Sequence, residues 1–270
     1  MLDLKTRFKE DFHEFLVFGW KQARACVFVG SFLAALILSN YIPLFGLARY
    51  DFLFLAAILI QVVLVLTKLE TKDEVKVIML FHVIGFALEV FKTSPGIGSW
   101  SYPEPGVFKL FNVPLYSGFM YSAVGSYISQ AWKLQKLRVE NYPPYIYSVP
   151  LAAAIYLNFF THHYLPDFRW VLTALVVLVF WKTDVYFVII EKVRRMKLLA
   201  SFALIGFFIW IAENISTWFG AWQYPDQTEV WHLVSFGKIS SWALLVIISV
   251  IIIADLKQFK AERDRAKIAI

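Results

Sequence analysis

Glu213-Asn-Ile-Ser-Thr217-Trp-Phe-Gly220-Ala-Trp222-Gln-Tyr224-Pro225 is a stretch that the chain carries twice. The earlier copy is Glu89-Val-Phe-Lys-Thr93-Ser-Pro-Gly-Ile-Gly98-Ser-Trp100-Ser-Tyr102-Pro103. Both read Glu, Thr four residues later, a short spacer, and then Gly-[Ser/Ala]-Trp-x-Tyr-Pro. The spacer has four residues after Thr93 and two after Thr217. Six identities in the same order, with Trp, Tyr and Pro among them, indicate an internal repeat.

The composition is that of a membrane protein. Of 270 residues, 59% are hydrophobic and 17% are charged, with a mean hydropathy of +0.62. Soluble domains average about 25% charged residues. The excess of basic over acidic residues gives a formal charge of +6. The basic residues form short clusters between apolar runs, so they indicate the membrane topology of the chain rather than a nucleic-acid-binding surface. The single cysteine, Cys26, excludes an intrachain disulfide and any Cys-based zinc or iron–sulfur site.

Eight apolar runs approach the roughly 20 residues that cross a bilayer. The sequence therefore predicts an all-α polytopic membrane protein with about eight transmembrane helices. Glu89 and Glu213 lie in the third and seventh of these runs. The runs are 25–42, 51–68, 75–92, 113–132, 146–164, 169–190, 197–217 and 234–254.

The distribution of Lys and Arg predicts the orientation. With eight spans, 20 of the 26 basic residues fall on one side, in segments 1–24, 68–76, 133–138, 192–197 and 255–267, and only four fall on the other side. Because cytoplasmic loops are enriched in Lys and Arg, we expect both termini in the cytoplasm and a multi-pass location in the plasma membrane.

The two motif copies end spans that are four spans apart, and an even offset preserves orientation. We therefore expect two parallel four-helix repeats, related by an axis along the membrane normal. The predicted segments are an amphipathic cytoplasmic N-terminal segment (1–24), the first repeat (25–132), a cytoplasmic linker (133–145), the second repeat (146–254) and a charged cytoplasmic tail (255–270). Segment 1–24 is either a helix in the membrane interface or an extension of the first span.

Charged residues inside spans are expensive at depth, so they are candidate functional residues. Glu89 and Glu213 both lie about one helical turn from the outer surface, counting ~1.5 Å per residue. Lys238 enters the eighth span at a similar depth. We predict an outer-leaflet cluster in which Glu89 and Glu213 are catalytic. Its substrate-binding part comprises Asn214 and Lys238, with an aromatic roof of Trp100, Tyr102, Trp222 and Tyr224. The structural alternative is a buried salt bridge between Lys238 and one glutamate.

Further polar residues are candidates for the same cavity. Thr93 and Thr217 follow their glutamates at i+4, and His82 precedes Glu89 by seven residues, so these side chains share a helix face with a carboxylate. Lys182 and Asp184 fall inside the predicted sixth span. They are either a second polar site in the same cavity, or residues that snorkel to the interface and pair with neighbouring helices.

No nucleotide-binding or metalloprotease motif occurs in the sequence, and His162-His163 are interpreted as interfacial residues. We expect no metal and no cofactor. The expected partners are membrane lipids and an isoprenoid or other apolar substrate, with no nucleic acid.

Over nearly its full length the chain resembles the YoaT-like family of uncharacterised bacterial integral membrane proteins. The resemblance is carried by Glu89…Gly98-Ser-Trp100-Ser-Tyr102-Pro103…Val113-Pro114-Leu115 and by Glu213…Trp222-Gln-Tyr224-Pro225, and that family implies no activity. More locally, Glu89…Gly98…Tyr102…Val113-Pro114-Leu115 is similar to elements of bacterial carotenoid hydratases, although Trp100 departs from that pattern.

Three functions stay open at this point. The first is an enzyme that protonates a double bond of an isoprenoid or other lipid and lets water capture the carbocation. The second is a transporter or binding protein with a cavity between the repeats. The third is a scaffold.

Overall fold

The computed structural model describes residues 2–268, with side chains described for residues 7–254. Within that part the chain is mostly helical, with short strands between some of the helices. The helices are α1 (Leu2–Ala25), α2 (Val27–Leu38), α3 (Arg49–Leu66), α4 (Lys72–Lys92), α5 (Tyr116–Leu134), α6 (Tyr145–Thr161), α7 (Arg169–Phe180), α8 (Leu198–Trp218) and α9 (Lys238–Ile268). The strands are β1 (Lys109–Leu110), β2 (Val113–Pro114), β3 (Arg138–Glu140), β4 (Asp184–Val188) and β5 (Val193–Lys197).

Two of the described helices, α3 and α8, are long and apolar enough to cross a membrane. The number rises to three when α1 and α2, which meet at an angle of 68°, are taken as one bent span. Helices α6 and α7 and the first part of α9 are apolar but shorter. The fold is therefore helical and compatible with a membrane protein.

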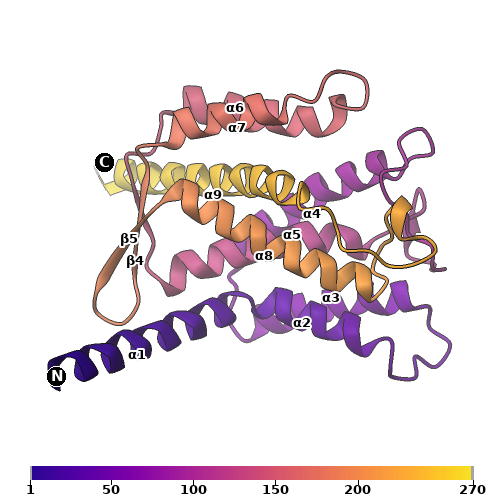
Figure 1. Ribbon diagram of the computed structural model, residues 1–270, viewed down its shortest axis with the longest axis horizontal. Coiled ribbons are helices and arrows are strands. Elements are labelled where there is room, and N and C mark those ends of the chain that lie inside the picture. The colour runs from indigo at the N-terminus through magenta and orange to yellow at the C-terminus, as the bar shows by residue number, and fades with distance from the viewer. Residues whose placement is uncertain (1, 269–270) are drawn as a thin grey trace.

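Most helices run along the long axis of the molecule (Figure 1). The hairpin of β4 and β5 and both chain ends lie at one end, on the left in Figure 1, and α8 runs from this hairpin toward the other end. The loops that follow α4 and α8, which contain the two motif copies, lie at that opposite end. The fold thus gathers both motif copies at one end of the bundle.

Glycine allows close packing between the helices that carry the glutamates and the helices that follow them. A Cβ at Gly85 in α4 would lie 2.2 Å from the Tyr121 ring in α5. A Cβ at Gly206 in α8 would lie 2.9 Å from the backbone nitrogen of Ala243 in α9. The start of α4 is fixed by a capping box, in which the Thr71 and Glu74 side chains each accept a bond from the other's backbone amide. The α4–α5 and α8–α9 pairs therefore hold the two glutamates at defined positions.

The predicted sixth span, 169–190, is wrong as a continuous helix. Helix α7 ends at Phe180, and the following residues form β4, which pairs antiparallel with both β3 and β5. β-branched and aromatic residues from Val185 to Val188 suit a strand. β3 lies inside the predicted linker 133–145, so these strands are also the main departure from the all-α prediction.

The first predicted span, 25–42, is also divided differently. The helix α2 within it has only 12 residues, and the chain bends at Cys26 where α1 ends. The division into repeats 25–132 and 146–254 stays a prediction.

Candidate functional site

Glu89 lies on the buried side of α4 and is only 2% exposed. Its Oε2 accepts hydrogen bonds from Trp100 Nε1 and from the Tyr102 hydroxyl, each at 2.7 Å. Its Oε1 accepts a hydrogen bond from the Tyr121 hydroxyl in α5 at 2.8 Å. Three aromatic donors therefore hold this carboxylate.

The loop after α4 folds back so that Trp100 and Tyr102 contact Glu89 in that helix. Thr93 donates its hydroxyl to the Glu89 carbonyl oxygen at 2.8 Å, at the helix end. Gly98 adopts a positive φ of 54°, which favours glycine, and the Ser99 amide bonds back to the Lys92 carbonyl at 2.9 Å. This turn explains why the motif contains Gly two residues before its Trp.

Glu213 in α8 has the corresponding arrangement and is also 2% exposed. Its Oε1 accepts from the Tyr224 hydroxyl at 2.6 Å, and its Oε2 accepts from Trp242 Nε1 in α9 at 2.7 Å. Gly220 supplies the positive φ, at 71°. In each copy the motif tyrosine thus donates to its own glutamate, and the following helix supplies one more aromatic donor. We call Glu89 and Glu213 with these five donors the caged glutamate pair.

The two motif copies touch through equivalent residues. Ser101 and Gln223 exchange both backbone hydrogen bonds, each at 2.9 Å, in an antiparallel bridge. The rings of Trp100 and Tyr224 meet edge to face with centroids 6.1 Å apart. The donors from the following helices, Tyr121 and Trp242, also lie next to each other, at 6.4 Å. The two cages are therefore in contact.

Arg49 at the start of α3 connects the two motif loops further. Its guanidinium pairs with Glu104 after the first copy and donates to the carbonyl oxygen of Phe219 in the second copy at 2.8 Å. Tyr116 donates its hydroxyl to the Ala221 carbonyl in the same region.

Lys238 does reach the site, but through aromatic faces. Its Nζ lies 4.4 Å from the Tyr224 ring centroid and 5.5 Å from the Trp100 ring centroid. Among the described residues it forms no ion pair with either glutamate, so the alternative of a direct salt bridge is wrong. The ammonium instead occupies a cation–π position between one ring from each motif copy.

Three predicted residues support the loops rather than contact a carboxylate. Asn214 Oδ1 accepts the Val234 amide at 2.9 Å, which positions the segment before α9. Thr217 accepts from Trp231 Nε1 at 3.1 Å and donates to the Asn214 carbonyl. Trp222 is buried next to the site.

The structure separates Lys182 and Asp184 from the caged pair. Lys182 is exposed beyond the end of α7. Asp184 is buried at the start of β4, where it pairs with Lys197 at 3.0 Å. Lys197 immediately precedes α8, so about 24 Å of helix lies between it and Glu213. The prediction that Lys182 and Asp184 share the cavity of the glutamates is therefore wrong, because the predicted sixth span is not one helix.

His82 is also set apart from Glu89. Its ring packs between Phe86 and Phe119, the latter at 4.6 Å, and its Nδ1 is buried without a hydrogen-bond partner. Seven residues of helix, about 10 Å, separate it from Glu89.

Sequence reasoning missed two of the five donors, Tyr121 and Trp242. A signal for them exists, because each lies eight residues after a buried valine, Val113 or Val234, that precedes the following helix. Aligning the repeats at these valines, in addition to the motif, matches the two aromatic residues.

Lys92, three residues after Glu89, contacts two histidines instead of that carboxylate. Its buried Nζ contacts His162 Nε2 at 3.2 Å and His163 Nε2 at 2.7 Å. In the loop beyond α6, burial and the neighbouring Lys92 ammonium lower the pKa of His163 to about 4, so this imidazole is neutral and accepts the hydrogen bond. No group of three or more His, Cys, Asp or Glu side chains that could hold a metal occurs within the described residues.

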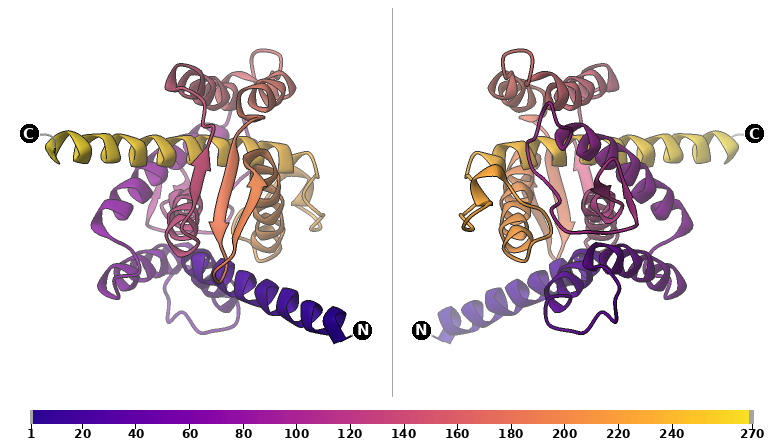
Figure 2. Two further views of the ribbon diagram at one scale, coloured as in Figure 1. Left: turned by 90° about the vertical axis from the view of Figure 1, so that its left-hand side faces the viewer. Right: turned by 90° about the vertical axis from the view of Figure 1, so that its right-hand side faces the viewer.

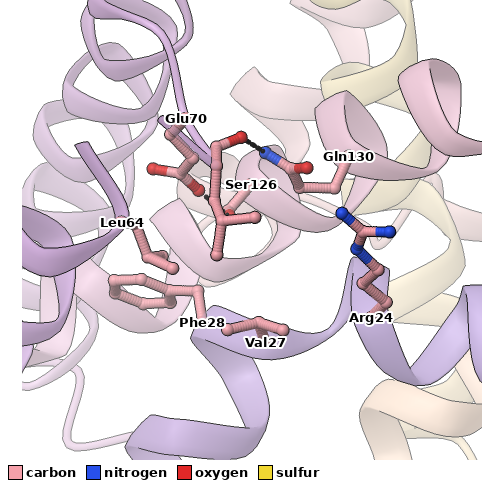
Figure 3. A pocket seen from close by; sticks show the side chains of 8 residues that line it. Arg24, Val27, Phe28, Leu64, Glu70, Ser126 and Gln130 are labelled. Carbon is pink, nitrogen blue, oxygen red and sulfur yellow. Dashed lines mark hydrogen bonds between the residues drawn. The ribbon is translucent and has the colours of Figure 1, made fainter. Parts of the chain in front are cut away.

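A small cavity lies away from the caged pair, beside the buried Glu70 that precedes α4 (Figure 3). Its volume is about 10 Å³, which is close to the space of one water molecule. Glu70 accepts hydrogen bonds from Ser126 and Gln61, and Arg24 and Gln130 also line the cavity.

Comparisons with known proteins agree with the full-length resemblance. A family model described as protein of unknown function (DUF817) matches residues 14–250. The uncharacterized protein YoaT of Bacillus subtilis (strain 168) is 55% identical over 245 residues, which cover 91% of this chain and 92% of that protein. No solved structure matches the chain. The predicted relationship to the YoaT-like family is confirmed, whereas the local similarity to carotenoid hydratases is not shown.

Proposed function

The chain belongs to the DUF817 family of proteins of unknown function, and we propose that its caged glutamate pair performs acid–base chemistry on a lipid-soluble substrate. The proposed protein is a multi-pass protein of the plasma membrane, with about eight spans, two parallel repeats and both termini in the cytoplasm. One glutamate supplies a proton to a carbon–carbon double bond, and the other receives a proton from water.

The exposed surface supports the membrane part of this proposal. Large apolar side chains stand exposed along the helices, among them Leu59 on α3, Leu178 on α7 and Phe208 on α8. Soluble monomers rarely expose contiguous apolar surface of this kind. The excess of Lys and Arg on one side supports the orientation, and the Ser101–Gln223 bridge supports the parallel repeats because equivalent residues meet there.

Charge balance is the observation that carries the chemistry. Two buried carboxylates share the neighbourhood of one ammonium, that of Lys238. An uncompensated buried charge costs several kcal/mol, so the cluster is more stable with one additional proton. A buried carboxyl group that holds a proton can act as a general acid.

The hydrogen bonds limit where this proton resides. Indole N–H groups only donate, so the oxygens facing Trp100 and Trp242 act as acceptors. The other oxygen of each glutamate faces a tyrosine hydroxyl, Tyr121 or Tyr224, which can reverse its role and accept. A proton can therefore sit at Glu89 Oε1 or Glu213 Oε1.

The reaction begins when the protonated glutamate transfers its proton to one carbon of the double bond, which leaves a carboxylate and a carbocation at the other carbon. Water adds to the carbocation, and the second glutamate takes the proton that the added water releases. The net result is an alcohol formed from an alkene and water. Lys238 already occupies the faces of Trp100 and Tyr224, so the cation is stabilised by rings of the site that Lys238 does not contact, such as Tyr121 and Trp242, an interaction of about 2 kcal/mol when desolvated.

A small-molecule transporter or binding protein is the second candidate, favoured by the contact between equivalent residues of the two motif copies. Polar groups at the interface of duplicated halves are the transporter pattern. The binding groups would then be the caged pair and Lys238, without Lys182 and Asp184.

Comparative lipid and pigment analysis separates the two candidates. A deletion strain is complemented with the wild-type chain, Glu89→Gln, Glu213→Gln, or Glu70→Gln as a matched buried glutamate outside the site. We expect a product heavier than its precursor by one water with wild type and Glu70→Gln, and loss of that product with both site variants at equal membrane levels. Unchanged extracts across all strains, together with saturable solute uptake that Glu89→Gln abolishes, would favour transport.

A further inference from the structure

The N-terminal helix α1 carries an unpartnered apolar stripe formed by Phe8, Phe12, Phe15, Leu16 and Trp20. These residues recur at helical spacing, and each is at least 53% exposed. Figure 2 shows α1 projecting sideways from the body of the molecule, with its N-terminal end free. Five large apolar side chains on one face need a partner that removes them from water.

The opposite face of α1 is already occupied by the β4–β5 hairpin. Arg194 makes a bidentate ion pair with Glu14 at 2.6 and 2.7 Å. Phe18 packs against Phe187 at 5.9 Å, and Lys21 donates to the Val188 carbonyl at 2.9 Å. The hairpin therefore fixes the rotation of α1 about its own axis, with the stripe turned away from the protein.

The bend between α1 and α2 fixes the direction of α1. The two helices meet at 68°. With α2 close to the membrane normal, α1 runs nearly in the membrane plane. The 12 residues of α2 give about 18 Å of helix, so α2 alone does not cross the ~30 Å hydrocarbon core. The exposed Arg24, two residues before the bend at Cys26, favours a place for the bend at the headgroup region rather than deeper in the core.

The chemistry of α1 fits a bilayer surface. A helix with Phe, Leu and Trp on one face and Lys and Arg on the other lies in the interface, with its apolar face in the acyl boundary. Arg7 and Arg24 are exposed on the polar side of α1, together with Glu10, while Lys9 lies at the edge of the stripe, where a long side chain can extend to the headgroups. The basic side of the predicted topology is the cytoplasmic side, whose anionic headgroups attract these cations.

We infer that α1 is an interfacial helix that docks its stripe on the cytoplasmic leaflet, and that the β4–β5 hairpin is the clamp that presents it. This inference rests on the topology in the proposed function and is independent of the chemistry at Glu89 and Glu213.

Nitroxide accessibility in the full chain tests the docking. In a Cys26→Ser background, single labels are placed on the stripe by Phe12→Cys and Leu16→Cys, and on the opposite exposed face by Glu10→Cys. In proteoliposomes we expect the stripe labels to be reached by oxygen and shielded from a water-soluble nickel chelate, with the reverse at Glu10→Cys. Nickel accessibility at Phe12→Cys and Leu16→Cys equal to that at Glu10→Cys overturns the inference.

Two further measurements show which premise is wrong if α1 does not dock on the cytoplasmic leaflet. Dipolar coupling between Phe12→Cys labels of two copies, with shielding that persists in detergent, would show that a second copy covers the stripe and would overturn lipid docking. Reaction of Glu10→Cys with a membrane-impermeant thiol reagent on intact cells would place the N-terminus outside, which contradicts docking on the cytoplasmic leaflet through its topology premise rather than through the glutamate chemistry.

Discussion

Ser101 and Gln223, the central residues of the two Trp-x-Tyr segments, exchange both of their backbone hydrogen bonds at 2.9 Å. This bridge places Trp100 against Tyr224, and these two side chains donate hydrogen bonds to different glutamates. The two carboxylates are therefore part of one connected site, and a change at one cage is expected to affect the other.

The two motif tyrosines differ in how much their glutamates depend on them. Glu213 has two donors, whereas Glu89 has three, so Tyr224→Phe leaves a larger deficit than Tyr102→Phe. Loss of a bond to a buried polar group costs about 1–3 kcal/mol. We expect both variants to melt earlier in detergent, Tyr224→Phe by the larger margin. Tyr147→Phe is the control, because Tyr147 is 60% exposed.

Lys238→Met removes the ammonium that lies over one ring of each cage and keeps the approximate length of the side chain. The remaining carboxylates then depend on additional protons, which are abundant at low pH. We expect the loss in melting temperature, relative to wild type, to be larger in alkaline buffer than in mildly acidic buffer. Adding Glu213→Gln should reduce this pH dependence, and a deficit that does not vary with pH would argue against shared protons.

Gly85→Ala tests the packing that holds Tyr121 on Glu89. A Cβ there would lie 2.2 Å from the Tyr121 ring, and overpacking of this kind costs about 1–3 kcal/mol. Gly30→Ala in α2 is the matched control, because nothing lies within 4 Å of its added Cβ and replacing an exposed helical glycine adds about 0.5–1 kcal/mol of stability. Equal melting temperatures for the two variants would contradict the packing of α4 on α5.

We expect the protein to lose folding stability in acid because of the loop histidine His163. Its folded pKa of about 4 lies below the ordinary value of about 6.5, so the unfolded chain takes up the proton first. Stability is therefore full above about pH 6.5 and falls as the pH drops toward about 4. The charged and titratable neighbours are Lys92 and His162. His163→Asn keeps a hydrogen-bond acceptor and should flatten the acid side of a melting-temperature profile, and an unchanged profile would contradict the lowered pKa.

The repeated motif was sufficient to predict that Glu89 and Glu213 meet Tyr102, Tyr224, Trp100 and Lys238 at one end of the bundle. A glutamate at the end of an apolar run needs nearby donors, and the motif supplies them from the following loop, 11 to 13 residues after the glutamate. Tyr121 and Trp242 were missed because aromatic residues are common in apolar runs and nothing local distinguishes a ligand from a membrane-facing side chain.

Lys182 and Asp184 were misplaced for a different reason. The apolar run from Arg169 to Ile190 has the length of a span, and its change from helix to strand depends on β3 and β5, which lie elsewhere in the sequence. The hydropathy of this run alone does not predict that β3 and β5 pair with it.

Infrared difference spectroscopy on the purified chain tests the central claim, that the caged glutamate pair holds one proton, most directly. We predict a carboxylic-acid carbonyl band at neutral pH that shifts in heavy water, is lost or altered in both Glu89→Gln and Glu213→Gln, and persists in Glu70→Gln. A spectrum in which neither site variant changes any carboxylic-acid band would contradict it.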